Sequence, residues 1–352
     1  MDKEKAKQII RTRTSKIVGG YITEILFSRM LDRQYPDLLY SRGWWGGIEN
    51  AEEHKLVFFA VKETLNELDY LLINRLEAYG YEWKQVSLQN GHIIIKDSNS
   101  TWSRDEFVKK RAIKASHDPN VDRKPRYDDP NMDKCLQFYE KAGMLNEIAT
   151  SIFIEDHFLN AFYTISNIDF ICRDNKGNPF YVEVKFKNEF KKLCKDGITR
   201  LVFGIDEFQY DYLFDAFYKC GMHVTNVILY NDSKDTSNTS STVIFDYMKN
   251  RTEEEYLWRR AVIKMDAQYE RFTVYAKHTS WYSNSSRTVY CVPLTDYSNM
   301  KNSCIIERRT HATGWGKCPK CGGEKVIRRN KRTGIELFVC NQCGELFEYM
   351  KK

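Results

Sequence analysis

The stretch that most constrains the fold is a pair of alternating segments separated by a turn, at residues 167–187. Ile168, Phe170 and Cys172 alternate with Asp169 and Ile171, which fits the period of two that a strand requires. Residues 174–179 (DNKGNP) are rich in turn formers, and alternation resumes in residues 180–186 (FYVEVKF). Glu183 and Lys185 therefore share one face of the second strand, about 7 Å apart at roughly 3.3 Å per residue. We expect two strands joined by a turn.

Three charged residues lie on these two predicted strands. Asp169 on the first strand, followed by Glu183-Val184-Lys185 on the second, resembles the signature of the PD-(D/E)XK nuclease superfamily. Ile168 replaces the usual Pro, which the family often lacks. The resemblance implies that Asp169 and Glu183 hold one or two Mg²⁺ (or Mn²⁺) ions, that Val184 lends its carbonyl, and that Lys185 orients or activates the attacking water.

Elementary chemistry supports the same roles. Mg²⁺ prefers carboxylate and carbonyl oxygens, and a bound metal acidifies water and neutralises charge on phosphate oxygens. A nearby ammonium stabilises the same negative charge. The alternative is that Asp169, Glu183 and Lys185 form the solvated face of an ordinary strand.

The flanking segments follow the order of elements in that nuclease fold. Apolar residues at helical spacing predict a helix from Leu145 to Phe153, and Phe158–Ile165 is a candidate first strand. After the two strands come a helix at residues 207–221 and an apolar strand at residues 223–232. We therefore expect an α/β fold with a restriction-endonuclease-like mixed sheet flanked by helices.

The family often carries a further acid on its first helix. Glu147 is our candidate for a fourth catalytic residue, and Glu24, in an upstream helical segment, is its rival. Gln209 occupies a position in the second helix where some members contact the active site or DNA. Each of these three is also compatible with a solvated helix position.

A polar segment with three Pro, residues 117–130 (HDPNVDRKPRYDDP), predicts a domain boundary. We expect a mostly helical accessory domain at residues 1–130, a nuclease core with a C-terminal extension at 131–310, and a zinc ribbon at 311–352. Within the first, we expect an anchoring Trp44-Trp45 loop, a long helix from Asn50 to Gly80, a hairpin at Asn90-Gly91, and a helix from Trp102 to Lys114 capped by Ser103.

The second half of the core has weaker signals. Residues 243–250 (VIFDYMKN) suggest an edge strand, and residues 252–271 a helix with a basic side. Residues 272–282 and 285–297 resemble paired strands on which aromatic and cationic residues interleave. That mixture suits single-stranded nucleic acid and an ordinary surface sheet equally.

The C-terminal segment contains two Cys pairs with the spacing C-x2-C-x18-C-x2-C. Two such knuckles predict a structural Zn²⁺ site in which four thiolates leave no open coordination position. The segment between them reads as two strands around a basic turn that could contact phosphates. It resembles the zinc ribbons attached to topoisomerases and to some restriction-type nucleases. The predicted ligands are Cys318, Cys321, Cys340 and Cys343.

Composition limits the remaining classes. The chain has 352 residues and a formal net charge of +6, which permits nucleic-acid binding through local patches. It has neither an apolar run long enough to span a membrane nor a secretory signal at its start. We therefore expect a cytoplasmic protein without membrane association.

Together these features predict a metal-dependent DNA endonuclease, in a restriction or phage-defence setting. The alternatives are a catalytically inactive nucleic-acid-binding or scaffold protein that works through the zinc ribbon, and an RNase, since the choice between DNA and RNA depends on contacts to the 2′-hydroxyl. A homodimer or a protein partner is compatible with the sequence.

Overall fold

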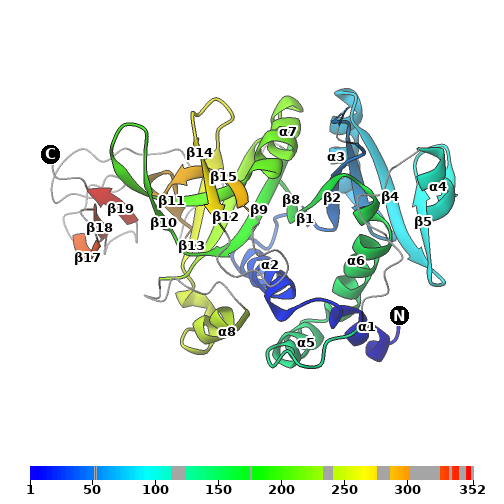
Figure 1. The fold of residues 1–352 in the computed structure, drawn as a ribbon, viewed down its shortest axis with the longest axis horizontal. Helices are drawn as coiled ribbons and strands as arrows, with labels where there is room; N and C mark the ends of the chain where they lie inside the picture. The colour runs from blue at the N-terminus through cyan, green and yellow to red at the C-terminus, as the bar shows by residue number, and fades with distance from the viewer. Residues whose placement is uncertain are drawn as a thin grey trace. The chain divides into compact units, whose positions relative to one another are not determined.

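The computed structural model describes residues 1–50, 52, 54–111, 124–174, 177–232, 241–275, 286–300, 326–332, 335–340 and 346–349 (Figure 1). The protein is mixed α/β, as expected, and the chain divides into two compact units. The first unit comprises residues 1–185, 216–224 and 237–253, and the second comprises residues 186–215, 225–236 and 254–352. The hairpin with Asp169 belongs to the same unit as the N-terminal segment, and the expected domain boundaries at residues 130 and 310 stay predictions.

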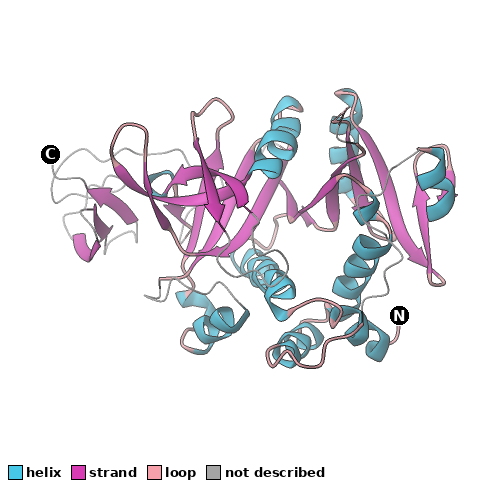
Figure 2. Cartoon of the chain, in the orientation of Figure 1, coloured by secondary structure: helices cyan, strands magenta, loops and turns pink. Residues whose placement is uncertain are grey.

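The first unit contains a mixed sheet in the order β6-β5-β4-β3-β2-β7, drawn as magenta arrows in Figure 2. β3 and β4 are parallel and are joined through α3 (Glu67–Ala78), whereas the other neighbours are antiparallel. Residues 1–130 are thus mixed α/β, which corrects the expectation of a mostly helical domain. The strands are β2 (Trp44–Ile48), β3 (Leu56–Val61), β4 (Glu82–Gln89), β5 (His92–Lys96), β6 (Thr101–Ser103) and β7 (Thr164–Ile168).

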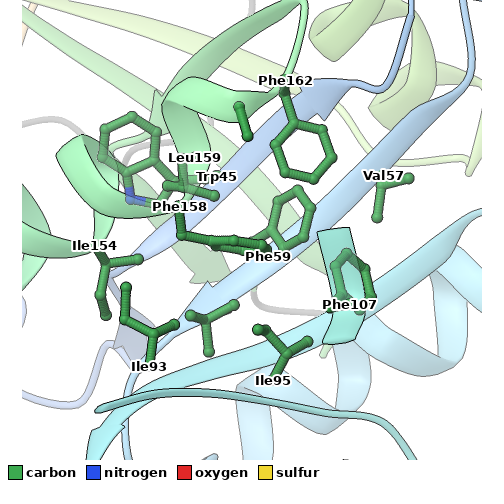
Figure 3. Close-up of a cluster of buried hydrophobic side chains, with 12 residues drawn as sticks. Trp45, Val57, Phe59, Ile93, Ile95, Phe107, Ile154, Phe158, Leu159 and Phe162 are labelled. Atoms are coloured by element: carbon green, nitrogen blue, oxygen red, sulfur yellow. The ribbon is translucent and has the colours of Figure 1, made fainter. Parts of the chain in front are cut away.

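Buried aromatic side chains hold this sheet against the segments that follow it in the chain (Figure 3). The Phe59 ring centroid lies 5.6 Å from that of Phe158 and 4.9 Å from that of Phe162, both at steep angles. Phe107 of α4 (Arg104–Lys110) packs 5.8 Å from Phe158. Fully burying one such side chain contributes about 1.5–3 kcal/mol. Trp45 joins this cluster, so the tryptophan pair anchors its own domain as expected, although it lies in β2 rather than in a loop.

Five helices surround the remaining core of the first unit: α1 (Lys3–Ile10), α2 (Ser15–Gln34), α5 (Met132–Lys141), α6 (Leu145–His157) and α8 (Ser241–Lys249). The α6 prediction is confirmed, including the burial of Ile148 and Ile152. α2 is tied to α5 by a hydrogen bond from the Tyr139 hydroxyl to the Val18 carbonyl. Near the start of α2, the guanidinium of Arg13 contacts two acids of α6 at 3.0 and 2.7 Å. These contacts fix the position of α2, which carries Glu24.

Two neighbouring stretches of the chain, residues 40–48 and 164–173, pair with each other in two different sheets and pass from one sheet to the other at adjacent positions. β2 pairs with β7, and the chain segments next to them, β1 (Tyr40–Ser41) and β8 (Phe170–Arg173), pair with each other in a second sheet. There β8 also pairs with β9 (Pro179–Lys187), which confirms the expected strand–turn–strand unit. Asp169 occupies the break between β7 and β8, so it lies at a strand end and not inside a strand.

Arg42 and Gly43 occupy the corresponding break between β1 and β2. Gly43 has φ +79°, and a Cβ atom there would lie 2.9 Å from the Val61 carbonyl oxygen. Glycine is therefore required for the sheet change. The two breaks place Arg42 and Asp169 on neighbouring strands.

The second unit contains three groups of strands. One sheet has the order β10-β11-β15-β14, and further strands are ordered β12-β13-β16 and β17-β18-β19. The predicted strand at 223–232 is confirmed as β12, and the predicted pairing after residue 270 is confirmed by β14 and β15. The bounds are β10 (Phe190–Leu193), β11 (Thr199–Asp206), β12 (Val224–Tyr230), β13 (Trp258–Ile263), β14 (Glu270–Tyr275), β15 (Ser286–Pro293), β16 (Ser298–Asn299), β17 (Val326–Arg332), β18 (Ile335–Cys340) and β19 (Leu346–Tyr349).

Short helical turns complete the chain. The predicted helix at residues 207–221 is a π-helical segment, η2 (Gln209–Phe214), that continues into α7 (Asp215–Lys219). The 3-10 turns are η1 (Leu159–Ala161), η3 (Glu253–Glu255) and η4 (Leu294–Asp296). No helix in the described part of the chain is long and apolar enough to cross a membrane.

Three predicted elements are wrong in type. The long helix expected from Asn50 to Gly80 is instead strand β3 followed by α3, since the continuous apolar run LVFFAV forms a buried strand. The edge strand expected at residues 243–250 is α8, and the helix expected at residues 252–271 contains β13 and the start of β14. Short apolar runs carry no period that separates helix from strand.

Two turn and cap predictions are confirmed. Asn90 and Gly91 both have positive φ, 50° and 83°, between β4 and β5. Ser103 caps α4 in a reciprocal capping box with Glu106. In both cases the signal is local, so its outcome does not depend on tertiary contacts.

Candidate functional site

The first unit brings Asp169, Glu183 and Lys185 together, as the sequence predicts. β8 and β9 are antiparallel, with Phe170 opposite Val182, so the strand break at Asp169 lies beside Glu183 and Val184. The three side chains meet in the interior: Asp169 and Glu183 are only 2% and 1% exposed. Burying charged groups so completely is costly unless each has a partner.

Asp169 is held by three donors. Its Oδ2 accepts a hydrogen bond from the Val184 backbone N–H at 2.7 Å, and its Oδ1 accepts one from the Asn167 amide at 2.6 Å. The Lys185 ammonium lies 3.4 Å from Oδ2. The carboxylate is thus fixed in orientation by its neighbours before any ligand binds.

Glu183 and Lys185 form a close ion pair on the same face of β9. The Lys185 ammonium contacts Glu183 Oε1, and the Tyr181 hydroxyl donates to Glu183 Oε2. The Tyr181 ring packs against Phe217, with centroids 5.0 Å apart. Alternation along β9 therefore places a hydroxyl, a carboxylate and an ammonium in one row.

Glu24 reaches the same cluster from α2, whereas Glu147 lies at its margin. Glu24 is 8% exposed, and the Arg42 guanidinium donates to its Oε2 at 3.3 Å. The Glu147 side chain is 55% exposed and lies 3.6 Å from the other end of Arg42. The charges of Lys185 and Glu183 act on the pKa of Glu24, in addition to burial and Arg42.

The electrostatics of the cluster are unfavourable for its carboxylates. Burial and the charge of Glu183 raise the pKa of Asp169 well above its usual value, although Lys185 opposes them. Burial likewise raises the pKa of Glu24 despite the nearby Arg42. For Lys185, burial lowers the pKa, but the charges of Asp169 and Glu183 outweigh burial and raise it. The lysine is therefore a firmly protonated cation beside Asp169, a carboxyl group that resists ionisation.

The carboxylates around a second lysine of the same unit have pKa shifts in the opposite direction to that of Asp169. The Lys84 ammonium lies 2.8 Å from Glu82 Oε1 and 2.8 Å from Asp97 Oδ2, so it also bridges two carboxylates. Burial acts to raise the pKa of Glu82, but hydrogen bonds from Lys84, Arg111 and Lys55 lower it to about 2. The pKa of Asp97 is also lowered. The ion pairs around Lys84 therefore stabilise the fold, in contrast to those at Asp169.

A cavity of about 560 Å³ opens beside the cluster. Asp169 and Glu24 lie in its wall, and the wall continues through the Arg42 break, the loop after β3, β4 and the first turns of α6. A volume of this size is typical of sites for small ligands. The cavity gives a ligand access to the Asp169 end of the cluster.

A second polar network lines this cavity, and the sequence analysis missed it. Asp69 is fully buried and accepts hydrogen bonds from the Trp44 indole at 2.7 Å and from Lys62 at 2.9 Å, as well as from Ser41. Lys62 also donates to Ser41 Oγ at 2.7 Å. The only local signal was Asn66 three residues before Asp69, the pattern of a capping box that the structure contains.

The donor set suits a hard divalent cation. Among the described residues, no group of three or more His, Cys, Asp or Glu side chains is already arranged to hold a metal ion. However, the Lys185 ammonium touches both Asp169 and Glu183, which demonstrates that one cation can contact both carboxylates. Carboxylate oxygens are the ligands that Mg²⁺ prefers.

The predicted zinc ligands are only partly within the described chain. Cys340 ends β18, and the hairpin expected between the Cys pairs is present as β17 and β18, with Val326 opposite Cys340. Cys318, Cys321 and Cys343 lie outside the described residues.

Gln209, the other residue that the sequence singles out, begins η2 in the second unit.

Comparisons with protein-family models, with curated proteins and with solved structures found no match. The functional argument therefore rests on the residues and geometry of this chain.

Proposed function

We propose that the protein is a metal-dependent endonuclease that hydrolyses phosphodiester bonds in DNA, of the PD-(D/E)XK type that its sequence resembles. The observation that carries the proposal is the buried cluster of Asp169, Glu183 and Lys185, with raised pKa at Asp169, beside an open cavity. Perturbed acids next to a cleft are characteristic of functional sites. An ion pair that serves only to stabilise the fold would not require burying carboxylates at such a cost in free energy.

In this proposal Asp169 and Glu183 hold the metal ion, and Glu24 is the acid contributed by a helix. We choose Glu24 over Glu147 because it is buried and because its pKa responds to the charges of Glu183 and Lys185. When bound, Mg²⁺ or Mn²⁺ neutralises charge on the phosphate and makes water a better nucleophile. Its two positive charges also relieve the repulsion between the carboxylates.

Lys185 orients the attacking water and stabilises the negative charge that builds on the phosphate. Because its pKa is raised, it stays protonated and acts as a donor, not as the general base. Asn167 and the Val184 N–H hold Asp169 in one rotamer, and Tyr181 does the same for Glu183. Fixed ligands avoid reorganisation during the reaction.

The test is cleavage of supercoiled plasmid in Mg²⁺ or Mn²⁺ by the wild type and by Asp169→Asn and Lys185→Met. Lys84→Met is the matched control, since Lys84 also bridges two carboxylates but lies outside the cavity wall. We expect both site variants to lose at least about 100-fold in rate, and the control to retain activity.

Other results would identify the alternatives. Metal-dependent cleavage of single-stranded RNA but not plasmid, with the same pattern among the variants, would make the enzyme an RNase. If no variant and no substrate is cut, but DNA binding depends on zinc, the protein is a binding module. Equal cleavage by all four proteins would place the activity elsewhere and refute the assignment of the site.

A further inference from the structure

The cavity beside Asp169 has a composition that indicates what it binds. Its described wall contains five carboxylates but only two cationic side chains, Arg42 and Lys62. Both cations are already paired: Arg42 lies 3.3 Å from Glu24, and Lys62 lies 2.9 Å from Asp69. Because neither cationic side chain is free to bind an anion, the interior of the cavity is not built for a phosphate group.

Neutral polar and aromatic groups form the rest of the wall. Amide or hydroxyl side chains come from the loop before α3, from β4, from α6 and from the end of β7, and the half-buried ring of Tyr21 comes from α2. A flat, uncharged ligand with hydrogen-bonding edges fits such a surface. Nucleobases have this chemistry, and sites that take an extruded base read its hydrogen-bonding edge. The neutral polar side chains include Asn66, Ser87, Asn146, Thr150, Ser151 and Asn167.

The position of the cavity connects it to the reaction. Asp169 lies both in the wall and in the acid cluster, so a nucleoside inside the cavity would leave its own phosphate close to the metal-binding end. The volume of about 560 Å³ is sufficient for a single small ligand but not for a stacked duplex.

We propose that this cavity receives one unstacked nucleoside of the nucleic-acid substrate and that the adjoining phosphate is thereby placed at Asp169. This inference rests on the proposed function, because it takes the substrate to be a nucleic-acid strand. It adds that the substrate must have an unpaired or extruded nucleotide next to the cleaved bond.

The test uses DNA single strands that carry the fluorescent base 2-aminopurine, whose emission is quenched by stacking and rises when the base is unstacked. Binding is measured by anisotropy of an end label, in Ca²⁺ in place of Mg²⁺, and strand integrity is checked on a denaturing gel. We expect a severalfold rise in emission when the wild type binds. Thr64→Trp should lose most of this rise, because Thr64 is an exposed residue of the cavity wall and a Trp side chain there would obstruct the mouth.

Thr101→Trp is the control, since Thr101 is an exposed residue of β6 outside the wall. It should behave as the wild type. The inference is overturned if strands do not bind, if they bind without a rise in emission, or if Thr64→Trp gives the same rise as the wild type. A second result would also overturn it. If free nucleoside monophosphates quench the tryptophan emission of the wild type but not of Thr64→Trp, and strands give no rise in 2-aminopurine emission, the cavity is a site for free nucleotides.

The plasmid assay separates this inference from the proposed function. Asp169-dependent cleavage without a 2-aminopurine signal would refute the cavity inference alone. A signal that depends on Thr64, in a protein that cleaves no substrate with any divalent metal, would support the cavity inference and refute the proposed catalysis.

Discussion

Replacing Asp169 with Asn should make the folded protein more stable. The carboxylate is 2% exposed and close to Glu183, and together these raise its pKa. Asn keeps the shape and can still accept the hydrogen bond from the Val184 N–H. The Asn167 amide can rotate to accept from the new amide, so neither group needs to lose its partner. What disappears is the cost of a buried charge beside a second one.

The size of the effect follows from the proton affinity. An exposed aspartate has a pKa of about 3.9, and in the folded protein the pKa of Asp169 is higher, so the folded state binds the proton more tightly. Stability is therefore greatest at low pH, falls as pH rises between the unfolded and folded pKa values, and stays low above them. Each tenfold difference in affinity corresponds to about 1.4 kcal/mol. We expect Asp169→Asn to gain on the order of 1–2 kcal/mol at pH 8, or about 2–4 °C in Tm for each kcal/mol.

The measurement is denaturant or thermal unfolding at pH 8 and pH 5 in the presence of a chelator. The gain should shrink at pH 5, where the wild type takes up its proton. Asp97→Asn is the matched control, because the pKa of Asp97 is lowered and the same substitution should destabilise. If Asp169→Asn is less stable than the wild type at pH 8, or if the difference does not depend on pH, the explanation based on a costly buried charge is wrong.

The proposed magnesium and zinc sites can each be tested by a binding measurement. Millimolar Mg²⁺ or Mn²⁺ should raise the Tm of the wild type, since a ligand that binds only the folded state stabilises it. Asp169→Asn should show no such rise, and an equal rise in both proteins would remove Asp169 from the metal site. The purified chain should contain one Zn²⁺, and this ion should be lost in Cys318→Ser and in Cys343→Ser. Cys172→Ser is the control and should keep the zinc, because it changes a buried free thiol. Metal analysis that finds zinc in all three variants would refute the zinc ribbon.

The core of the candidate site was predictable because its signals are local. Alternation and the turn at residues 174–179 define two strands, and antiparallel pairing then brings Asp169 close to Glu183 and Lys185. The turn at Asn90-Gly91 was predicted correctly for the same reason, since both residues favour the positive φ that the turn needs. Where a few adjacent residues determine the outcome, sequence is sufficient.

The rest of the site depends on contacts between segments far apart in the chain. Arg42 meets Glu24 and comes close to Glu147 because two paired strands change sheets together, which no local pattern records. The choice of Glu24 over Glu147 depends on burial, and both lie on helices with similar local signals. β3 was mistaken for helix because the apolar run LVFFAV is buried on both faces and so lacks alternation.

Lys84 and Lys185 give the clearest indication that the cluster serves something other than stability. Lys84 and Lys185 each lie between two carboxylates, yet the pKa of Glu82 falls to about 2 whereas that of Asp169 rises. The difference lies in the surroundings, since the acids at Lys84 are 22–23% exposed and Glu82 has further cationic partners in Lys55 and Arg111. The acids at Lys185 have almost no solvent and share one ammonium. A divalent cation would add positive charge beside these buried acids, so the free energy spent on burying them becomes affinity for the metal.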